Sequence, residues 1–208
     1  MTLPKVRDDS GVTLIELMVS MTIMAVAMTM FTTAALQMYQ AANKTESLSN
    51  AQAELNTVFL RLDRLVRYAS GISDVKQSGS TYYLGVLVVE AERPVCNAIR
   101  LVGAQKKLQI VAWNESDPTN RPPWTTLAND VLGRAVKKPD GTVEYVEPFT
   151  LVEATPTYNF DRLQLDLTAV VGSGLKGTQT NTSVQITALN TSLASTTPNV
   201  CNTYEGRP

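Results

Sequence analysis

"GVTLIELMVSMTIMAVAM", residues 11–28, decides how the rest of this sequence is interpreted. The stretch is apolar enough for a bilayer, yet Glu16 lies near its start. A carboxylate at membrane depth costs about 2.5–3.5 kcal/mol on insertion scales, so an ionisable residue there is expected to have a function. No charged side chain occurs from Leu17 to Asn43. About 20 apolar residues span a bilayer, so we expect a transmembrane helix here.

One long helix is predicted to continue beyond the apolar run. Gly11 and Gly71 bracket residues 12–70, which contain neither glycine nor proline, the two strongest helix breakers. After Asn43 the pattern becomes amphipathic. Apolar residues recur there at spacings of 3 and 4, which predicts a stripe that packs on a folded domain: Leu48, Ala51, Leu55, Val58, Leu62, Leu65 and Ala69.

A β-rich domain is predicted after Gly71, because apolar and polar residues then alternate with period 2. Residues 163–169 and 184–188 are predicted strands with one buried face, and 82–90 is a central strand. Residues 97–102 and 107–113 form a predicted hairpin through Gly103. The expected fold class is α+β. Its four parts are a leader (1–11), a membrane helix (12–43), an amphipathic helix half (44–70) and a mostly antiparallel head (71–208).

Composition argues against several classes of function. The 208 residues carry a formal net charge of −1 and no histidine. The usual general base and any Ser-His-Asp arrangement are therefore missing, and there is no basic field to attract nucleic acid directly. A loop at 114–124 places four oxygen side chains together, but without the spacing of a calcium motif: Asn114, Glu115, Asp117 and Asn120. We expect no catalytic residue, no metal and no cofactor.

Two cysteines, Cys96 and Cys201, lie 105 positions apart. In an oxidising, exported location a disulfide between them is expected. In the chain-entropy model it would stabilise the head by up to about 4–5 kcal/mol. The alternative is a pair of buried, inert thiols.

The residues before the apolar run are short and polar, with Lys5 and Arg7 to hold them in the cytoplasm. An ordinary secretory signal is one interpretation, with Ala25-Val26-Ala27 as its cleavage site. Glu16 argues against this interpretation, because it would then lie inside the apolar region of the signal, where an ordinary signal has no function for a carboxylate. The apolar stretch also continues well past Ala27.

"GVTLIEL" (11–17) resembles the type IV pilin and pseudopilin processing motif: a glycine, the cut, an apolar residue, Thr, Leu, a branched apolar residue and a glutamate. The resemblance implies that a prepilin peptidase cuts between Gly11 and Val12 and methylates the new amine of Val12. It also implies that Glu16 aligns an incoming subunit, its carboxylate meeting the Val12 amine of a neighbour. Other pilin or pseudopilin subunits would be direct partners, and a membrane platform protein and an assembly ATPase indirect ones.

The segment departs from the usual motif in two places: Val12 stands where the family usually has Phe, and Asp8 and Asp9 make the leader less basic. Two other features favour a minor subunit. Residues 12–70 lack the helix-loosening Pro and Gly of many major pilins, and the mature chain, 12–208, is large. We therefore expect a minor pilin or pseudopilin, lodged in the membrane lipid before assembly and at the cell surface afterwards, that primes assembly or sits at a filament tip. The alternative is an uncleaved, single-pass surface protein with a ligand-binding head.

Overall fold

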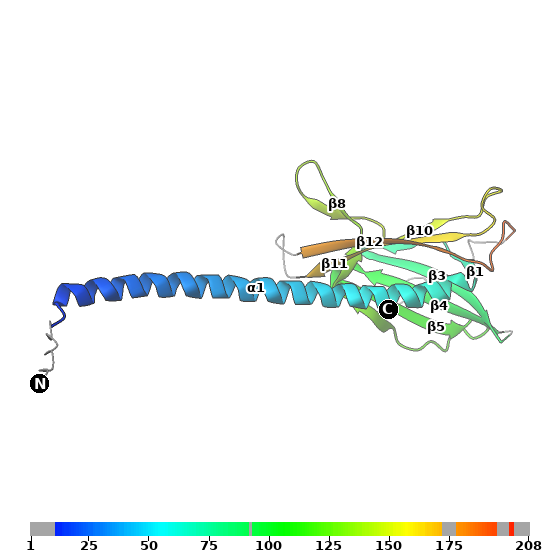
Figure 1. Ribbon diagram of the computed structural model, residues 1–208. Coiled ribbons are helices and arrows are strands. Elements are labelled where there is room, and N and C mark those ends of the chain that lie inside the picture. The colour runs from blue at the N-terminus through cyan, green and yellow to red at the C-terminus, as the bar shows by residue number, and fades with distance from the viewer. Residues whose placement is uncertain (1–10, 92, 172–177, 195–199, 202–208) are drawn as a thin grey trace, which may run out of the picture. The chain divides into compact units, whose positions relative to one another are not determined.

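The computed structural model describes residues 11–91, 93–171, 178–194 and 200–201 (Figure 1). One long helix, α1 (Leu14–Arg67), is followed by a succession of β-strands. Two compact units divide the chain, Met1–Thr45 and Glu46–Pro208. The second unit, called the head below, contains the last part of α1 and all the strands. The α+β, pilin-like layout expected from the sequence is confirmed.

The helix begins at Leu14, two residues after the predicted start at 12, and it ends slightly early. The Thr13 carbonyl accepts the first hydrogen bonds, from the N–H groups of Glu16 and Leu17 at 3.1 and 3.2 Å. The helix stops at Arg67, three residues before the predicted end at 70, because Ala69–Ile72 form β1 and pair with β3. Gly71 is therefore a strand residue instead of a helix stop. A Cβ there would lie 2.8 Å from Val200 Cγ2, so a larger residue would have to displace the Val200 side chain.

The larger sheet of the head contains six strands, all in antiparallel pairs. Its order is β1-β3-β4-β5-β6, with β2 also paired to β3. The interior position of residues 82–90 and the hairpin through Gly103 are both confirmed, the latter with a 3-10 turn, η1 (Gly103–Gln105). The remaining strands of this sheet are β2 (Lys76–Ser78), β3 (Thr81–Glu90), β4 (Arg93–Val102), β5 (Lys107–Asn114) and β6 (Thr125–Asn129).

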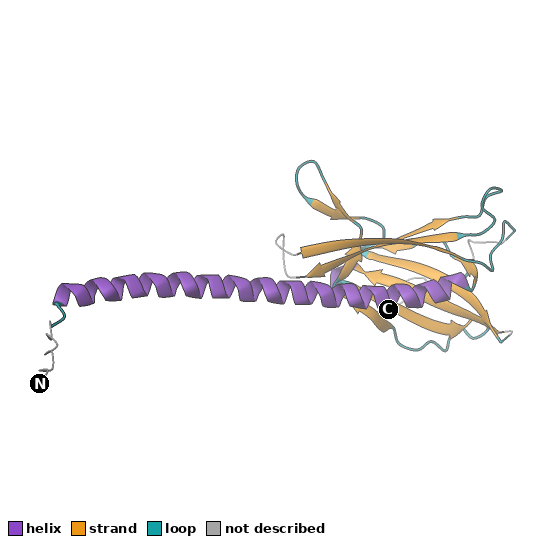
Figure 2. Cartoon of the chain, in the orientation of Figure 1, coloured by secondary structure: helices purple, strands orange, loops and turns teal. Residues whose placement is uncertain are grey.

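A second sheet is built on β11 (Arg162–Val171). One side of β11 pairs along its length with β12 (Thr178–Thr187), and the other pairs with β10 (Phe149–Val152) and β7 (Val131–Gly133). A short ribbon of β8 (Ala135–Lys137) and β9 (Val143–Tyr145) completes the strands. Its turn contains Gly141 at φ +85°, a conformation that favours glycine. Figure 2 shows these strands with the helix.

One hydrophobic core joins the amphipathic part of α1 to both sheets. The buried residues of the helix are Leu55, Val58, Phe59, Leu62 and Val66. Three of them, Leu55, Val58 and Leu62, belong to the stripe predicted from the spacing. Three other members of that stripe are half-buried: Leu48, Ala51 and Leu65. The alternating leucines of β11 are also buried in this core.

The expectation of a single buried face was wrong for β11. Asp166 and Thr168, on its other face, are only 6% and 0% exposed. The reason is local: the Thr168 hydroxyl accepts from the Ala135 N–H and donates to Asn181 Oδ1, so the β8 segment lies over it.

Candidate processing and assembly segment

Gly11 and Val12 lie in an exposed stretch just before the helix. A Cβ placed on Gly11 would meet no atom within 4 Å, so nothing in the described chain requires a glycine at this position. The predicted leader residues 1–10 lie outside the described residues.

Glu16 lies in the first turn of α1, where a negative charge is favoured by the helix dipole. Its side chain is exposed, and its carboxylate has no ion pair or hydrogen bond among the described residues. Apolar side chains follow it immediately on the same helix. A carboxylate in apolar surroundings is tolerated when it is paired, and the described residues of this chain offer Glu16 no such partner.

The N-terminal part of α1 presents mostly apolar side chains. Residues 11–47 are all exposed, with Met21 at 72% and Phe31 at 73%. Hydroxyl groups there donate back to main-chain carbonyls three or four residues earlier: Ser20, Thr22, Thr29, Thr32 and Thr33. This removes the cost of placing free donors in lipid. Among the described residues, α1 is the helix long and apolar enough to cross a membrane.

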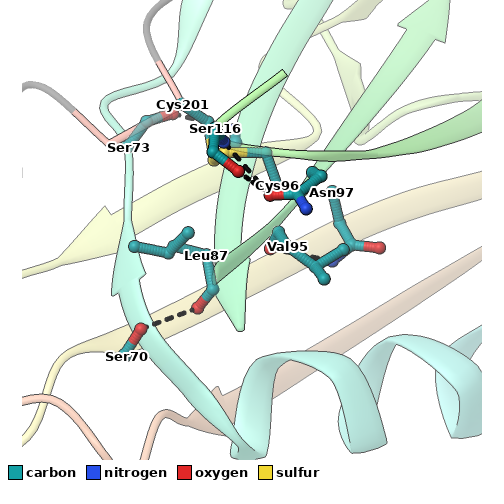
Figure 3. Close-up of a disulfide and its surroundings, with 10 residues drawn as sticks. Ser70, Ser73, Leu87, Val95, Cys96, Asn97, Ser116 and Cys201 are labelled. Atoms are coloured by element: carbon teal, nitrogen blue, oxygen red, sulfur yellow. Dashed lines mark hydrogen bonds between the residues drawn. A yellow bond between two sulfur atoms is a disulfide. The ribbon is translucent and has the colours of Figure 1, made fainter. Parts of the chain in front are cut away.

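The expected disulfide is present in the head (Figure 3). Cys96 on β4 and Cys201 are bonded, with their Cα atoms 5.6 Å apart. Both are buried in a small cluster that also contains Ala98, Val111 and Trp113. The bond ties the end of the chain to the larger sheet.

The oxygen-rich loop forms local turns. Asn114 Oδ1 accepts from the N–H and hydroxyl of Ser116, and Asp117 Oδ1 accepts from the Thr119 hydroxyl. Within the described residues no group of three or more acidic, cysteine or histidine side chains is arranged to hold a metal. The two tryptophans beside the loop pack against arginines: Arg121 lies 4.4 Å from the Trp113 ring and Arg100 lies 4.1 Å from the Trp124 ring.

Two clefts lie on the surface of the head. One of about 530 Å³ contains Arg61 and Arg64 beside the exposed Tyr68 and Val89. Arg67, their neighbour on the helix, instead forms an ion pair with Asp63 at 2.7 Å.

The other cleft, of about 480 Å³, is polar and contains Tyr82, Glu147 and Asp166. Burial raises the pKa of Tyr82, and the negative charges of Glu147 and Glu144 raise it further. Neither cleft gathers a set of groups that indicates a reaction.

The comparison with protein families identifies the N-terminal segment. Residues 6–32 match the prokaryotic N-terminal methylation motif. This match supports a type IV pilin or pseudopilin family for the chain, as the resemblance of residues 11–17 implied. The motif implies a precursor that is processed by prepilin peptidase and assembles with other pilin subunits. Together with the apolar helix it indicates a membrane-anchored pilin, and the family is structural in function.

No curated protein and no solved structure matches this chain. The family assignment therefore rests on residues 6–32 and on the layout of helix and head.

Proposed function

We propose that this chain is a minor pilin or pseudopilin. Prepilin peptidase cuts it between Gly11 and Val12 and methylates the new Val12 amine. Residues 12–43 hold it in the cytoplasmic membrane, with the leader 1–11 inside and the head outside. Residues 44–70 connect this anchor to the strands of 71–208. The observation that carries the proposal is the methylation motif at 6–32, which overlaps the exposed apolar part of α1.

Glu16 acts in assembly by pairing with the Val12 amine of a neighbouring subunit. Its exposure, and the lack of a partner for it among the described residues, support this role. Pairing two charges removes most of the cost of burying either alone, and it also fixes the register between neighbouring helices. The apolar side chains that follow then pack against those of other subunits.

A minor role is supported by the helix and by the length of the chain. Residues 12–70 contain no Pro or Gly, and α1 is a regular α-helix from Leu14 to Arg67. The subunit would prime assembly or occupy the tip of a type IV pilus, a competence pilus or a type II secretion pseudopilus. A platform protein and an assembly ATPase would act on it indirectly. We assign it no catalytic activity.

The test is intact-mass and N-terminal sequence analysis of the protein from native membranes and from sheared surface filaments. We expect a chain that begins at Val12, with or without one methyl group. A start at Met28 would indicate ordinary signal cleavage. An N-terminus at residue 1 or 2 would favour the uncleaved surface protein.

A matched pair of variants sharpens this test. Gly11→Leu places a large side chain where the fold has room for it, so it should leave the head intact and block the cut. Ser20→Leu, on the exposed part of α1, enlarges a side chain away from the cut and should be processed normally. Normal processing of Gly11→Leu would contradict recognition of the glycine.

A further inference from the structure

The polar cleft of the head lies where one strand of the second sheet changes its partner. Along β11, pairing with β7 ends at Leu167 and pairing with β10 begins at Leu165. Asp166 lies between the two, and its N–H donates to the Pro148 carbonyl at 2.8 Å. The chain leaves the sheet here as the β8–β9 ribbon, which projects from the head (Figure 1). Asp166 is the most buried of the residues that line the cleft, so it forms the floor.

The base of the ribbon is held firmly beside this cleft. The Val146 N–H donates to the Arg134 carbonyl at 2.9 Å, and the Tyr145 hydroxyl accepts from the Gln179 amide at 2.7 Å. A Cβ placed on Gly133 would collide with the Val146 carbonyl, so the chain segments are in close contact there. The cleft is therefore formed by the fold itself, as ligand sites usually are.

Asp166 has a carboxylate oxygen without a partner at the floor of the cleft. The residue is only 6% exposed. Its Oδ2 atom accepts from the Gln164 amide at 2.9 Å, but Oδ1 is buried and has no hydrogen-bond partner among the described residues. No described residue forms an ion pair with it. Because burying a carboxylate without a counter-charge is costly, this oxygen suits a cationic donor that enters the cleft.

The rim of the cleft carries two further charges without partners. Glu147 and Arg134 are exposed and form no ion pair among the described residues. Glu144 differs, because Lys138 pairs with it at 2.9 Å. The unpaired charges are therefore one carboxylate at the floor, one carboxylate at the rim and one guanidinium at the rim. A molecule with two ammonium groups and one carboxylate is their complement.

An organic ligand fits this cleft better than a metal ion does. Within the described part of the chain, no group of three or more acidic, cysteine or histidine side chains is arranged to hold a metal. The volume of about 480 Å³ lies in the range of small-molecule sites. Between floor and rim the cleft is lined by half-buried Tyr82, Tyr145 and Val146. These side chains offer an apolar surface on which an aliphatic chain can lie.

We propose that the polar cleft binds a free basic α-amino acid. The side-chain ammonium of the ligand donates to Asp166 Oδ1 at the floor, and its aliphatic chain lies along Tyr82 and Tyr145. Its α-carboxylate pairs with Arg134 at the rim, and its α-ammonium pairs with Glu147. This site lies within the head, and its occupancy does not depend on processing or on assembly.

The test is isothermal titration calorimetry of the full chain in detergent, with L-lysine as the probe. The wild type should bind it saturably. L-norleucine has the same carbon chain without the side-chain ammonium, and it should bind at least about tenfold more weakly, because Asp166 would stay unpaired. Cadaverine lacks the carboxylate and should bind about two- to fivefold more weakly, because an exposed ion pair contributes less.

Variants of the chain separate the floor from the rim. Asp166→Asn keeps the shape of the side chain, and it should weaken L-lysine binding about tenfold or more and remove the preference over L-norleucine. Glu147→Gln and Arg134→Gln should each weaken binding about two- to fivefold and leave the thermal unfolding of the head unchanged, because both residues are exposed. Glu153→Gln is the matched control, since Glu153 is exposed and does not line the cleft, and it should bind as the wild type does.

Three results would overturn the proposal. One is the absence of saturable binding of L-lysine at millimolar concentration. Another is equal binding of Nα-acetyl-L-lysine amide, which has no free α-ammonium or carboxylate; the cleft would then take a lysine side chain of another protein. The third is binding of Ca²⁺ that Asp166→Asn abolishes and L-lysine does not displace, which would assign the cleft to a metal.

Discussion

The two parts of α1 share one secondary structure and differ in almost everything else. From Leu14 to Ser47 all residues are exposed, although most of the large side chains are apolar. From Leu55 to Val66 an equally apolar stripe is buried, with Leu62 and Val66 at 0% exposure. The first part therefore exposes its apolar surface, and the second buries it within its own chain.

This difference separates two sources of stability within one helix. The buried part is stabilised by the head, because burying a leucine removes apolar area from water at about 25 cal/mol per Å². The exposed part can obtain the same gain only from lipid or from other subunits. A substitution in the exposed part should therefore affect location and assembly, and one in the buried part should affect folding of the head.

The largest expected effect is loss of assembly in Glu16→Ala. Export and cleavage should continue, because the apolar helix and Gly11 are unchanged. Incorporation into filaments should fall by at least about tenfold, because the Val12 amine of a neighbour would be buried without a counter-charge. The measurement is the ratio of cleaved protein in sheared filaments to cleaved protein in membranes.

Glu46→Ala is the matched control for that variant. Glu46 is also an exposed glutamate on α1, and it lies just after the uncharged run. Its removal should leave the ratio unchanged. Equal ratios for Glu16→Ala and the wild type would refute the assembly role of Glu16.

A second prediction contrasts the two parts of the helix by truncating one apolar residue in each. Leu62→Ala should lower the free energy of unfolding of the head by about 2–5 kcal/mol, because it leaves a cavity in a fully buried site. Met24→Ala removes a side chain that is 61% exposed and should change head stability by less than about 0.5 kcal/mol. Chemical denaturation of both variants in detergent, followed by tryptophan fluorescence, measures the difference.

Equal destabilisation by the two variants would show that head folding depends on the N-terminal part of α1. A loss confined to Leu62→Ala would show that the two parts contribute separately, as their burial indicates.

Much of the fold was predictable because period and composition decide it locally. The absence of Gly and Pro between 12 and 70 predicted α1, and the spacing of Leu55, Val58 and Leu62 predicted its buried face. The helix end was missed because β1 forms only when Ala69–Ile72 meet β3, a pairing that local sequence does not encode. The burial of Asp166 was missed for a similar reason, since it depends on segments distant in the sequence.

The residues of the candidate site could be selected from the sequence alone. Gly11, Val12 and Glu16 form a contiguous motif, so a pattern in the sequence was enough to select them. The polar cleft above Asp166 was not predictable in this way. Which residue of β11 lies between two partner strands follows from the pairing order of the whole sheet.

The smallest expected effect concerns the polar face of the buried part of α1. Asp63 and Arg67 form an ion pair one turn apart, with both side chains substantially exposed at 38% and 46%. Such exposed i,i+4 pairs contribute about 0.3–0.5 kcal/mol. Asp63→Asn should therefore lower head stability by no more than that, and less in high salt, because solvent and ions screen the pair. Arg67→Ala should cost slightly more, because Arg67 also interacts with the negative end of the helix dipole. Urea denaturation of both variants at low and at high salt measures these losses in the free energy of unfolding. A loss comparable to that of Leu62→Ala would mean that the polar face, and not the apolar stripe, holds this part of the helix to the head.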